Sequence, residues 1–89
     1  MELNRILASF CRQKILIELS KQKELNVMAL VRKVNSTYDE VNRNLGILER
    51  ESLVIQKYIG RMRLIRLNST NKFTDVLINA LKTLESPKN

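Results

Sequence analysis

The sequence contains no histidine, and this absence removes several kinds of chemistry at once. No imidazole is available to activate a nucleophile, and the carboxylates are not clustered as an acid–base pair would require. The single cysteine, Cys11, excludes an intramolecular disulfide and leaves no Cys/His ligand set for a soft metal. We therefore expect a protein that is not an enzyme, needs no cofactor and no metal, and holds Cys11 reduced within a helix.

Long hydrophobic runs and aromatic residues are also scarce. No apolar run approaches the roughly 20 residues of a membrane span, and the first residues lack the apolar core of a signal peptide. We expect a cytoplasmic protein without membrane contact. Tryptophan is absent and only 4% of the residues are aromatic, which predicts an aliphatic core. Such a thin core in a single domain of 89 residues is often stabilised by forming a homodimer.

Positive charge, in contrast, is abundant. The chain has 16 Lys and Arg residues against 9 Asp and Glu residues, a net charge of +7. A polyanionic partner is expected, with nucleic acid first and an anionic membrane surface second. The placement of these charges decides between the two.

The central stretch, residues 35–54, has the pattern of an amphipathic helix with a polar outer face. Ser36 is the expected N-cap, with acidic residues in the first turn. The apolar stripe is narrow and consists of Val41, Leu45 and Leu48. The opposite face carries Asp39, Asn42, Arg43, Gly46 and Arg50. Asn and Arg make paired hydrogen bonds to adenine and guanine in a major groove, although a solvated surface helix has a similar pattern.

Two further helices are expected before this stretch. Residues 1–23 are helical in pattern, with an interruption near residues 9–12 that indicates a bend or two consecutive helices. A polar turn over residues 22–26 leads to a short helix at 27–34, capped by Asn26. Because only a short turn separates this helix from the central one, the pair predicts a helix-turn-helix. Arg32 and Lys33 at its end are placed to bind phosphates, although cations near a helix C-terminus are common for dipole reasons.

Residues 53–67 are rich in apolar and β-branched residues and are broken once, at Gly60, which predicts a β-hairpin. In the expected register Gln56 and Tyr58 share a face with Arg61 and Arg63. Four cations without an intervening acid suit contact with phosphates or a minor groove: Lys57, Arg61, Arg63 and Arg66. The alternative is an edge strand that carries charge against aggregation. The other face is apolar at Ile55, Ile59, Met62 and Leu64, so we expect it to be covered unless the register differs.

A last helix is predicted over residues 72–85. Its wide apolar stripe consists of Phe73, Val76, Leu77, Ala80, Leu81 and Leu84. We expect this stripe to form a dimer interface together with Leu3 and Ile6 of the first helix, the alternative being that it closes the core of its own chain. Pro87 ends the helix, and residues 86–89 are expected to form a flexible tail. No linker divides residues 1–89, which predicts a single domain.

This order of elements resembles the winged helix-turn-helix regulators of the ArsR and MarR type. The family's recognition-helix pattern V-S-R-x-L-x-x-L-x-x-x-G-L-V and its wing ending G-R-x-x-x-x-x-L are matched by Val41, Asn42, Arg43, Leu45, Leu48, Leu53, Val54, Gly60, Arg61 and Leu67. The earlier D-P-x-R-x-x-I-L-x-x-L run is matched in part, by Arg12, Ile15, Leu16 and Leu19. The family's glycine after the recognition helix is Ser52 here, at a position that often has a positive φ. Its metal-binding Cys and His residues are missing, so metal sensing is not carried over.

The resemblance implies a mainly α-helical winged helix-turn-helix domain with a small β-hairpin, in the order helix, helix, helix, strand, strand, helix. It implies a sequence-specific transcription regulator of double-stranded DNA. The expected base contacts are Thr37, Tyr38, Asn42, Arg43 and Asn44. The expected backbone contacts are Arg32, Lys33, Lys57, Arg61 and Arg63. The alternatives are an architectural or partition-type DNA-binding protein with little sequence preference, and a winged helix used as a protein-interaction module.

Overall fold

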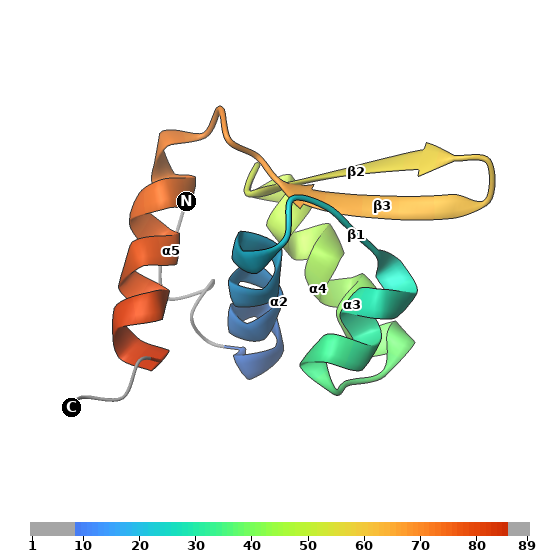
Figure 1. The fold of residues 1–89 in the computed structure, drawn as a ribbon, viewed down its shortest axis with the longest axis horizontal. Coiled ribbons are helices and arrows are strands. Elements are labelled where there is room, and N and C mark those ends of the chain that lie inside the picture. Colours follow the sequence, from blue (N-terminus) through green and yellow to red (C-terminus); the bar gives the residue numbers. More distant parts are fainter. Residues whose placement is uncertain (1–8, 86–89) are drawn as a thin grey trace.

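The computed structural model describes residues 9–85, with side chains up to residue 83. Its elements are α2 (Phe10–Lys21), β1 (Leu25–Asn26), α3 (Val27–Val34), α4 (Tyr38–Arg50), β2 (Val54–Ile59), β3 (Met62–Leu67) and α5 (Lys72–Glu85) (Figure 1). The start of α2 follows the N-cap Ser9, which agrees with the interruption expected near residues 9–12. The predictions for Leu3, Ile6 and residues 86–89 lie outside the described residues, as does the side chain of Leu84.

Helix α2 lies at the centre of the molecule, with α3 and α4 on one side and α5 on the other (Figure 1). The hairpin β2–β3 projects away from α5. The predicted aliphatic core is confirmed, because no aromatic residue is among the buried side chains that the structure describes. The largest fully buried side chains are Ile15, Leu16, Leu30, Val41, Leu45, Leu48, Leu53, Val54 and Ile65.

The three strands form one antiparallel sheet in the order β1-β3-β2. The predicted hairpin and its register are confirmed: Gln56 lies opposite Ile65, and Tyr58 lies opposite Arg63. Gly60 in the turn has a φ of 61°, a conformation that glycine adopts without steric cost. Strand β1 was not predicted, since residues 22–26 were expected to form a turn. Two residues are too few to show a strand period, and only the pairing with Leu64 and Ile65 defines β1.

The turn between α3 and α4 differs in one detail from the prediction. Asn26 caps α3 as expected, by accepting from the backbone N–H of Ala29 at 2.9 Å. Helix α4, however, begins one residue later than predicted, with Thr37 as its N-cap accepting from the N–H of Glu40. The hydroxyl of Ser36 instead donates to the Glu40 carboxylate at 2.5 Å. Both hydroxyls therefore bind Glu40, and the choice of Ser36 as the cap was wrong.

Helix α4 ends in a left-handed turn at Ser52, which has a φ of 62°. The N–H of Ser52 donates to the carbonyl of Glu49, and the N–H of Leu53 donates to the carbonyl of Leu48, both at 2.9 Å. This pair of bonds is the Schellman arrangement, completed by burial of Leu48 and Leu53. The positive φ expected at the position of the family glycine is confirmed, although serine occupies it.

The apolar stripe of α5 is divided between two directions. Leu77 and Leu81 are buried with Thr74 and Ile78 in the core of the chain, so their assignment to a dimer interface was wrong. Phe73 and Val76 are 59% and 64% exposed, and Ala80 is exposed as well. The six predicted positions form a stripe wider than one contact face of a helix, and the core takes only the part that faces α2.

No described helix is long and apolar enough to cross a membrane.

Candidate nucleic-acid interface

The outer face of α4 is exposed because its opposite face is fully used in packing. Val41, Leu45 and Leu48 have no exposed surface, since they pack into the core beside α2. The exposed residues of the helix and its N-cap are Thr37, Tyr38, Asp39, Asn42, Arg43, Glu49 and Arg50. Four of the five predicted base-contacting residues are thus accessible. Their side chains offer a hydroxyl, a phenol, an amide and a guanidinium, which together can donate to and accept from base edges.

Asn44, the fifth predicted base contact, is only 4% exposed and belongs to the core. Its Oδ1 accepts from Nε of Arg12 at 2.7 Å, and its Nδ2 donates to the carbonyl of Glu40 at 2.9 Å. With its amide engaged on both sides, Asn44 fixes α2 against α4. Its assignment as a base contact was wrong. Three consecutive residues of a helix, here residues 42–44, point in different directions and cannot all face outward.

The cations that were predicted to contact the DNA backbone differ in exposure and in ion pairing. Arg32 and Lys33 are exposed at the end of α3, and Arg61 is exposed in the turn of the hairpin. Lys57 is half exposed and forms an ion pair with Glu24, with 3.3 Å between Nζ and Oε2. Its charge is therefore partly used within the chain.

Arg63 is half buried and connects the hairpin to α4. Its Nε and Nη2 donate to Oε1 of Gln56 at 2.9 and 2.6 Å, and its Nη1 donates to the hydroxyl of Tyr38 at 3.2 Å. Gln56 in turn donates to Oε1 of Glu49 at 2.9 Å. Because Tyr38 is the first residue of α4 and Glu49 lies in its last turn, the hairpin is tied to both ends of this helix.

Gln56 is the residue of this network that sequence reasoning missed. Its role follows from the register, since Gln56 and Arg63 are diagonal neighbours on one face of the hairpin, within reach of long side chains. The predicted register already placed the two on the same face. What the sequence did not show was that Tyr38 would lie against that face.

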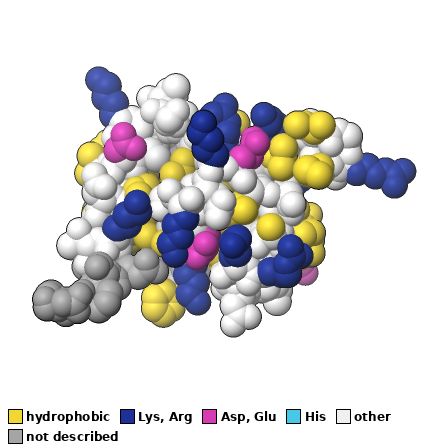
Figure 2. Space-filling view, viewed as in Figure 1, with side chains coloured by type: hydrophobic (Ala, Val, Ile, Leu, Met, Phe, Trp, Pro, Cys, Tyr) yellow, Lys and Arg dark blue, Asp and Glu magenta, His cyan; other side chains and the backbone are white. Residues whose placement is uncertain are grey.

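The outer part of the hairpin carries exposed apolar side chains. Ile59 and Met62 are 59% and 52% exposed on one face, and Tyr58 is exposed on the other. Figure 2 shows hydrophobic side chains gathered on this projecting part of the molecule, beside Lys and Arg side chains. The expected cover over Ile59 and Met62 is not provided by any residue that the structure describes. An open groove of about 470 Å³ is lined by residues of the hairpin, by the start of α3 and by Tyr38.

Cys11 lies beside this interface but is buried between α2 and the start of α4. Its Sγ is 4.0 Å from the hydroxyl of Ser36. Burial raises the pKa of the Cys11 thiol, and the charge of Glu40 acts in the same direction, while hydrogen bonds with Ser36 and Asn44 and the charge of Lys14 act against it.

Within residues 9–85 no three His, Cys, Asp or Glu residues are grouped closely enough to hold a metal ion.

No protein-family model and no curated protein matches this sequence. Solved structures do match it. HlyU from Vibrio cholerae has a TM-score of 0.79 at 23% identity, over 93% of this chain and 87% of its own. The transcriptional regulator HlyU from Vibrio vulnificus has a TM-score of 0.78 at 25% identity, over 94% and 84% of the two chains.

The transcriptional repressor BigR from Xylella fastidiosa has a TM-score of 0.79 at 21% identity, over 94% of this chain and 83% of its own. HlyU from Vibrio vulnificus and BigR are both transcription regulators. Four helices and a three-stranded antiparallel sheet in the described residues match their architecture. The chain therefore has the winged helix-turn-helix fold of the ArsR- and MarR-type regulators, with α4 in the position of that fold's recognition helix and β2–β3 in the position of its wing.

Proposed function

We propose that this protein is a sequence-specific transcription regulator that binds double-stranded DNA. The observation that carries the proposal is the exposed polar face of α4, held in a fixed position relative to a basic wing by Arg63 and Tyr38. Helix α4 enters the major groove, where Asn42 and Arg43 make the base contacts. Thr37 and Tyr38 at the helix start lie next to the bases or the adjoining phosphates.

The cations around α4 bind the DNA backbone in this proposal. Arg32 and Lys33 bind phosphates beside the major groove, and Arg61 at the wing turn binds a phosphate or enters the minor groove. Lys57 contributes less, because Glu24 already offsets its charge. Arg63 holds the wing in position, since two of its nitrogens are used on Gln56.

The protein acts as a homodimer in the cytoplasm. The exposed stripe of α5, formed by Phe73, Val76 and Ala80, supports a dimer because its residues follow one another at spacings of three and four on the outward side. A two-fold dimer places two recognition helices about one turn of DNA apart, roughly 34 Å, so a nearly palindromic operator is expected.

The exposed apolar side chains of the wing favour a second candidate, a protein-interaction module. Ile59 and Met62 lie on the face opposite Arg63, where a DNA backbone gains little from them. A partner protein that covered this face would bury apolar surface. This candidate predicts negligible affinity for DNA at moderate salt.

The test is fluorescence anisotropy with labelled duplexes, comparing the region upstream of the protein's own gene with random sequence. A sequence-selective regulator binds the first duplex more tightly, and the salt dependence counts its phosphate contacts at about 0.9 per contact. Equal binding to both duplexes indicates an architectural role. Absence of binding at low salt contradicts the DNA proposal and leaves the interaction module.

A double variant, Asn42→Ala with Arg43→Ala, tests the recognition helix itself. Each lost paired contact costs about 1–3 kcal/mol of discrimination, so the preference for the selected duplex is expected to fall at least tenfold. Lys82→Ala removes one exposed charge from α5 and is expected to keep the preference. A double variant that retained its preference would show that α4 does not select the sequence.

A further inference from the structure

A second groove lies on the far side of α2 from the recognition helix. It has a volume of about 640 Å³ and is bounded by the end of α2, the end of β3 and the inner side of α5. Apolar side chains of Leu19, Leu67 and Ile78 line it, together with the polar side chains of Ser69 and Asn79. This volume is within the range of sites that hold small organic molecules, about 300–1,000 Å³.

The charges around this groove are unbalanced. Four cations line it, namely Lys21, Lys23, Arg66 and Lys82, against the single carboxylate of Asp75. They come from three separate parts of the chain, which meet only in the folded molecule.

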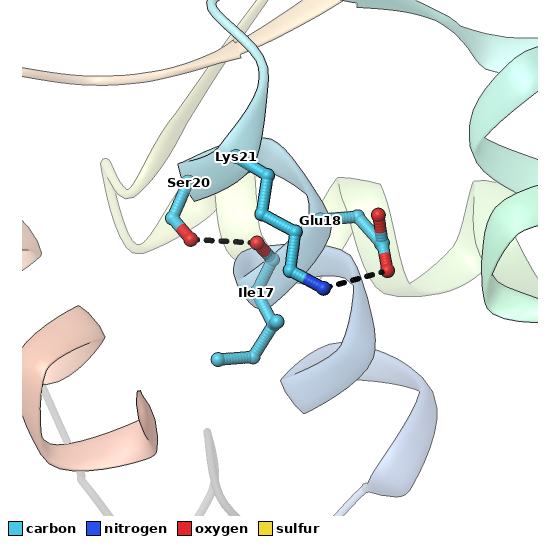
Figure 3. A network of polar contacts seen from close by, with 4 residues as sticks. All are labelled: Ile17, Glu18, Ser20 and Lys21. Carbon is cyan, nitrogen blue, oxygen red and sulfur yellow. Dashed lines mark hydrogen bonds and ion pairs between the residues drawn. The ribbon is translucent and has the colours of Figure 1, made fainter. Parts of the chain in front are cut away.

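Lys21 differs from the other three cations because it has a partner. Its Nζ lies 3.6 Å from Oε2 of Glu18, one turn back along α2, as Figure 3 shows. In the same turn the hydroxyl of Ser20 donates to the carbonyl of Ile17 at 2.6 Å and is therefore already engaged. Among the described residues, Lys23, Arg66 and Lys82 form no ion pair, and neither does Asp75.

Like charges that line one groove without ion-pair partners repel one another, and a bound anion offsets that repulsion. A simple inorganic anion would leave the apolar lining of Leu19 and Ile78 unused. We infer that this groove binds a small organic anion with two or more negative charges, its charged groups on Lys23, Arg66 and Lys82 and its body on the apolar side chains. Arg66 supplies a planar pair of donors suited to a phosphate or carboxylate.

The groove shares no lining residue with the proposed DNA interface. Helix α2 contacts α5 on one side and α4 on the other, so a ligand in the groove leaves the outer face of α4 free. The same helix is bonded to α4 through Arg12 and Asn44, which gives a physical connection between the groove and the recognition helix. Anion binding itself does not depend on whether the protein binds DNA, and it is measured without DNA.

The test is titration of the full chain with ADP and, separately, with citrate at low salt, followed by amide chemical shifts in two-dimensional NMR. Adenosine, which lacks the charge, is the ligand control. Saturable shifts with ADP or citrate at Arg66, Ser69 and Asn79, with none from adenosine, are the expected result. No saturation with either anion, equal binding of adenosine, or shifts centred on α4 and the wing would overturn the inference.

A double variant, Arg66→Gln with Lys82→Gln, tests the charges directly. Both side chains are exposed, so the fold is expected to survive, and the spectrum of the free protein checks this. Loss of two charged donors is expected to weaken anion binding at least about tenfold. Lys14→Gln with Lys33→Gln removes the same charge outside the groove and is expected to change the affinity by less than about threefold. Equal losses in the two double variants would contradict a defined site.

Discussion

Helices α4 and α5 both pack against α2, yet they divide their apolar residues differently. In α4 the three stripe positions Val41, Leu45 and Leu48 are all buried, and the exposed residues of the helix are all polar or charged. In α5 only part of the apolar set is buried, and residues such as Phe73 and Val76 face outward. A narrow stripe specifies a single neighbour, whereas a wide stripe has to be shared between the core and a second surface. The width of the stripe, and not its regularity, therefore limits what periodicity can predict.

Two adjacent residues of α5 give the largest test of this difference. Leu77→Ala is expected to lower the free energy of unfolding by about 2–4 kcal/mol, because it leaves a cavity against α2. Val76→Ala is expected to change it by less than about 0.5 kcal/mol in the monomer, because that side chain is exposed. Urea unfolding measured by circular dichroism at low protein concentration gives both values.

The same two substitutions distinguish the packing of α5 in the core from its proposed contact in the dimer. Val76→Ala is expected to weaken self-association in sedimentation equilibrium, with no loss of monomer stability. Equal destabilisation of the monomer by both substitutions would mean that the two surfaces of α5 are not distinct. Unchanged association in Val76→Ala would remove this stripe from the dimer interface.

In α4 the corresponding pair is Asn44 and Asn42. Asn44→Ala is expected to cost about 1–3 kcal/mol of stability, since the Arg12 guanidinium and the Glu40 carbonyl lose a buried partner. Asn42→Ala, two positions earlier on the exposed face, is expected to be neutral within about 0.5 kcal/mol. Thermal unfolding distinguishes them, and a neutral Asn44→Ala would show that the α2–α4 bond is dispensable.

Where the sequence predicted correctly, one local rule was enough. The hairpin register followed from alternation around Gly60. The positive φ at Ser52 was expected from the resemblance to the family, whose glycine occupies that position. Where it failed, the deciding partner lay far along the chain. Asn44 was wrongly predicted to contact DNA, because its hydrogen-bond partner Arg12 lies 32 positions away and the local pattern does not reveal it. Strand β1 was missed because only its pairing with β3 defines it.

Ser52 gives a smaller test at the end of α4. Ser52→Gly is expected to raise the free energy of unfolding by about 0.5–1 kcal/mol, because glycine adopts a positive φ without the clash of a Cβ atom. Ser69→Gly is the matched control, since Ser69 has no positive φ, and it is expected to be neutral or slightly destabilising. Urea unfolding of the two variants is compared. A stability unchanged by Ser52→Gly would show that the left-handed turn is not strained.

The smallest expected effect concerns the reactivity of Cys11. The rate at which its thiol reacts with a disulfide reagent reports on the packing between α2 and α4, and no change in stability is involved. Because burial raises its pKa, less thiolate is present at pH 8 than in an unfolded chain, and reaction with a disulfide reagent is expected to be slower than in urea. The rate should rise with pH beyond the range where a free thiol levels off. If the reaction rate at pH 8 equalled that of the unfolded chain, the contact between α2 and α4 around Cys11 would open readily.

Strand β1 has a consequence for the order in which the chain assembles. Each helix, and the hairpin β2–β3, is built from neighbouring residues, whereas β1 joins Leu25 and Asn26 to Ile65 and Leu64. Such closure costs chain entropy before it gains a contact, so local pieces form first. The β1–β3 pairing encloses α3, α4 and β2 in one loop, and we expect this loop to close after those elements have formed. The shortest element of the sheet therefore closes the longest loop within that sheet.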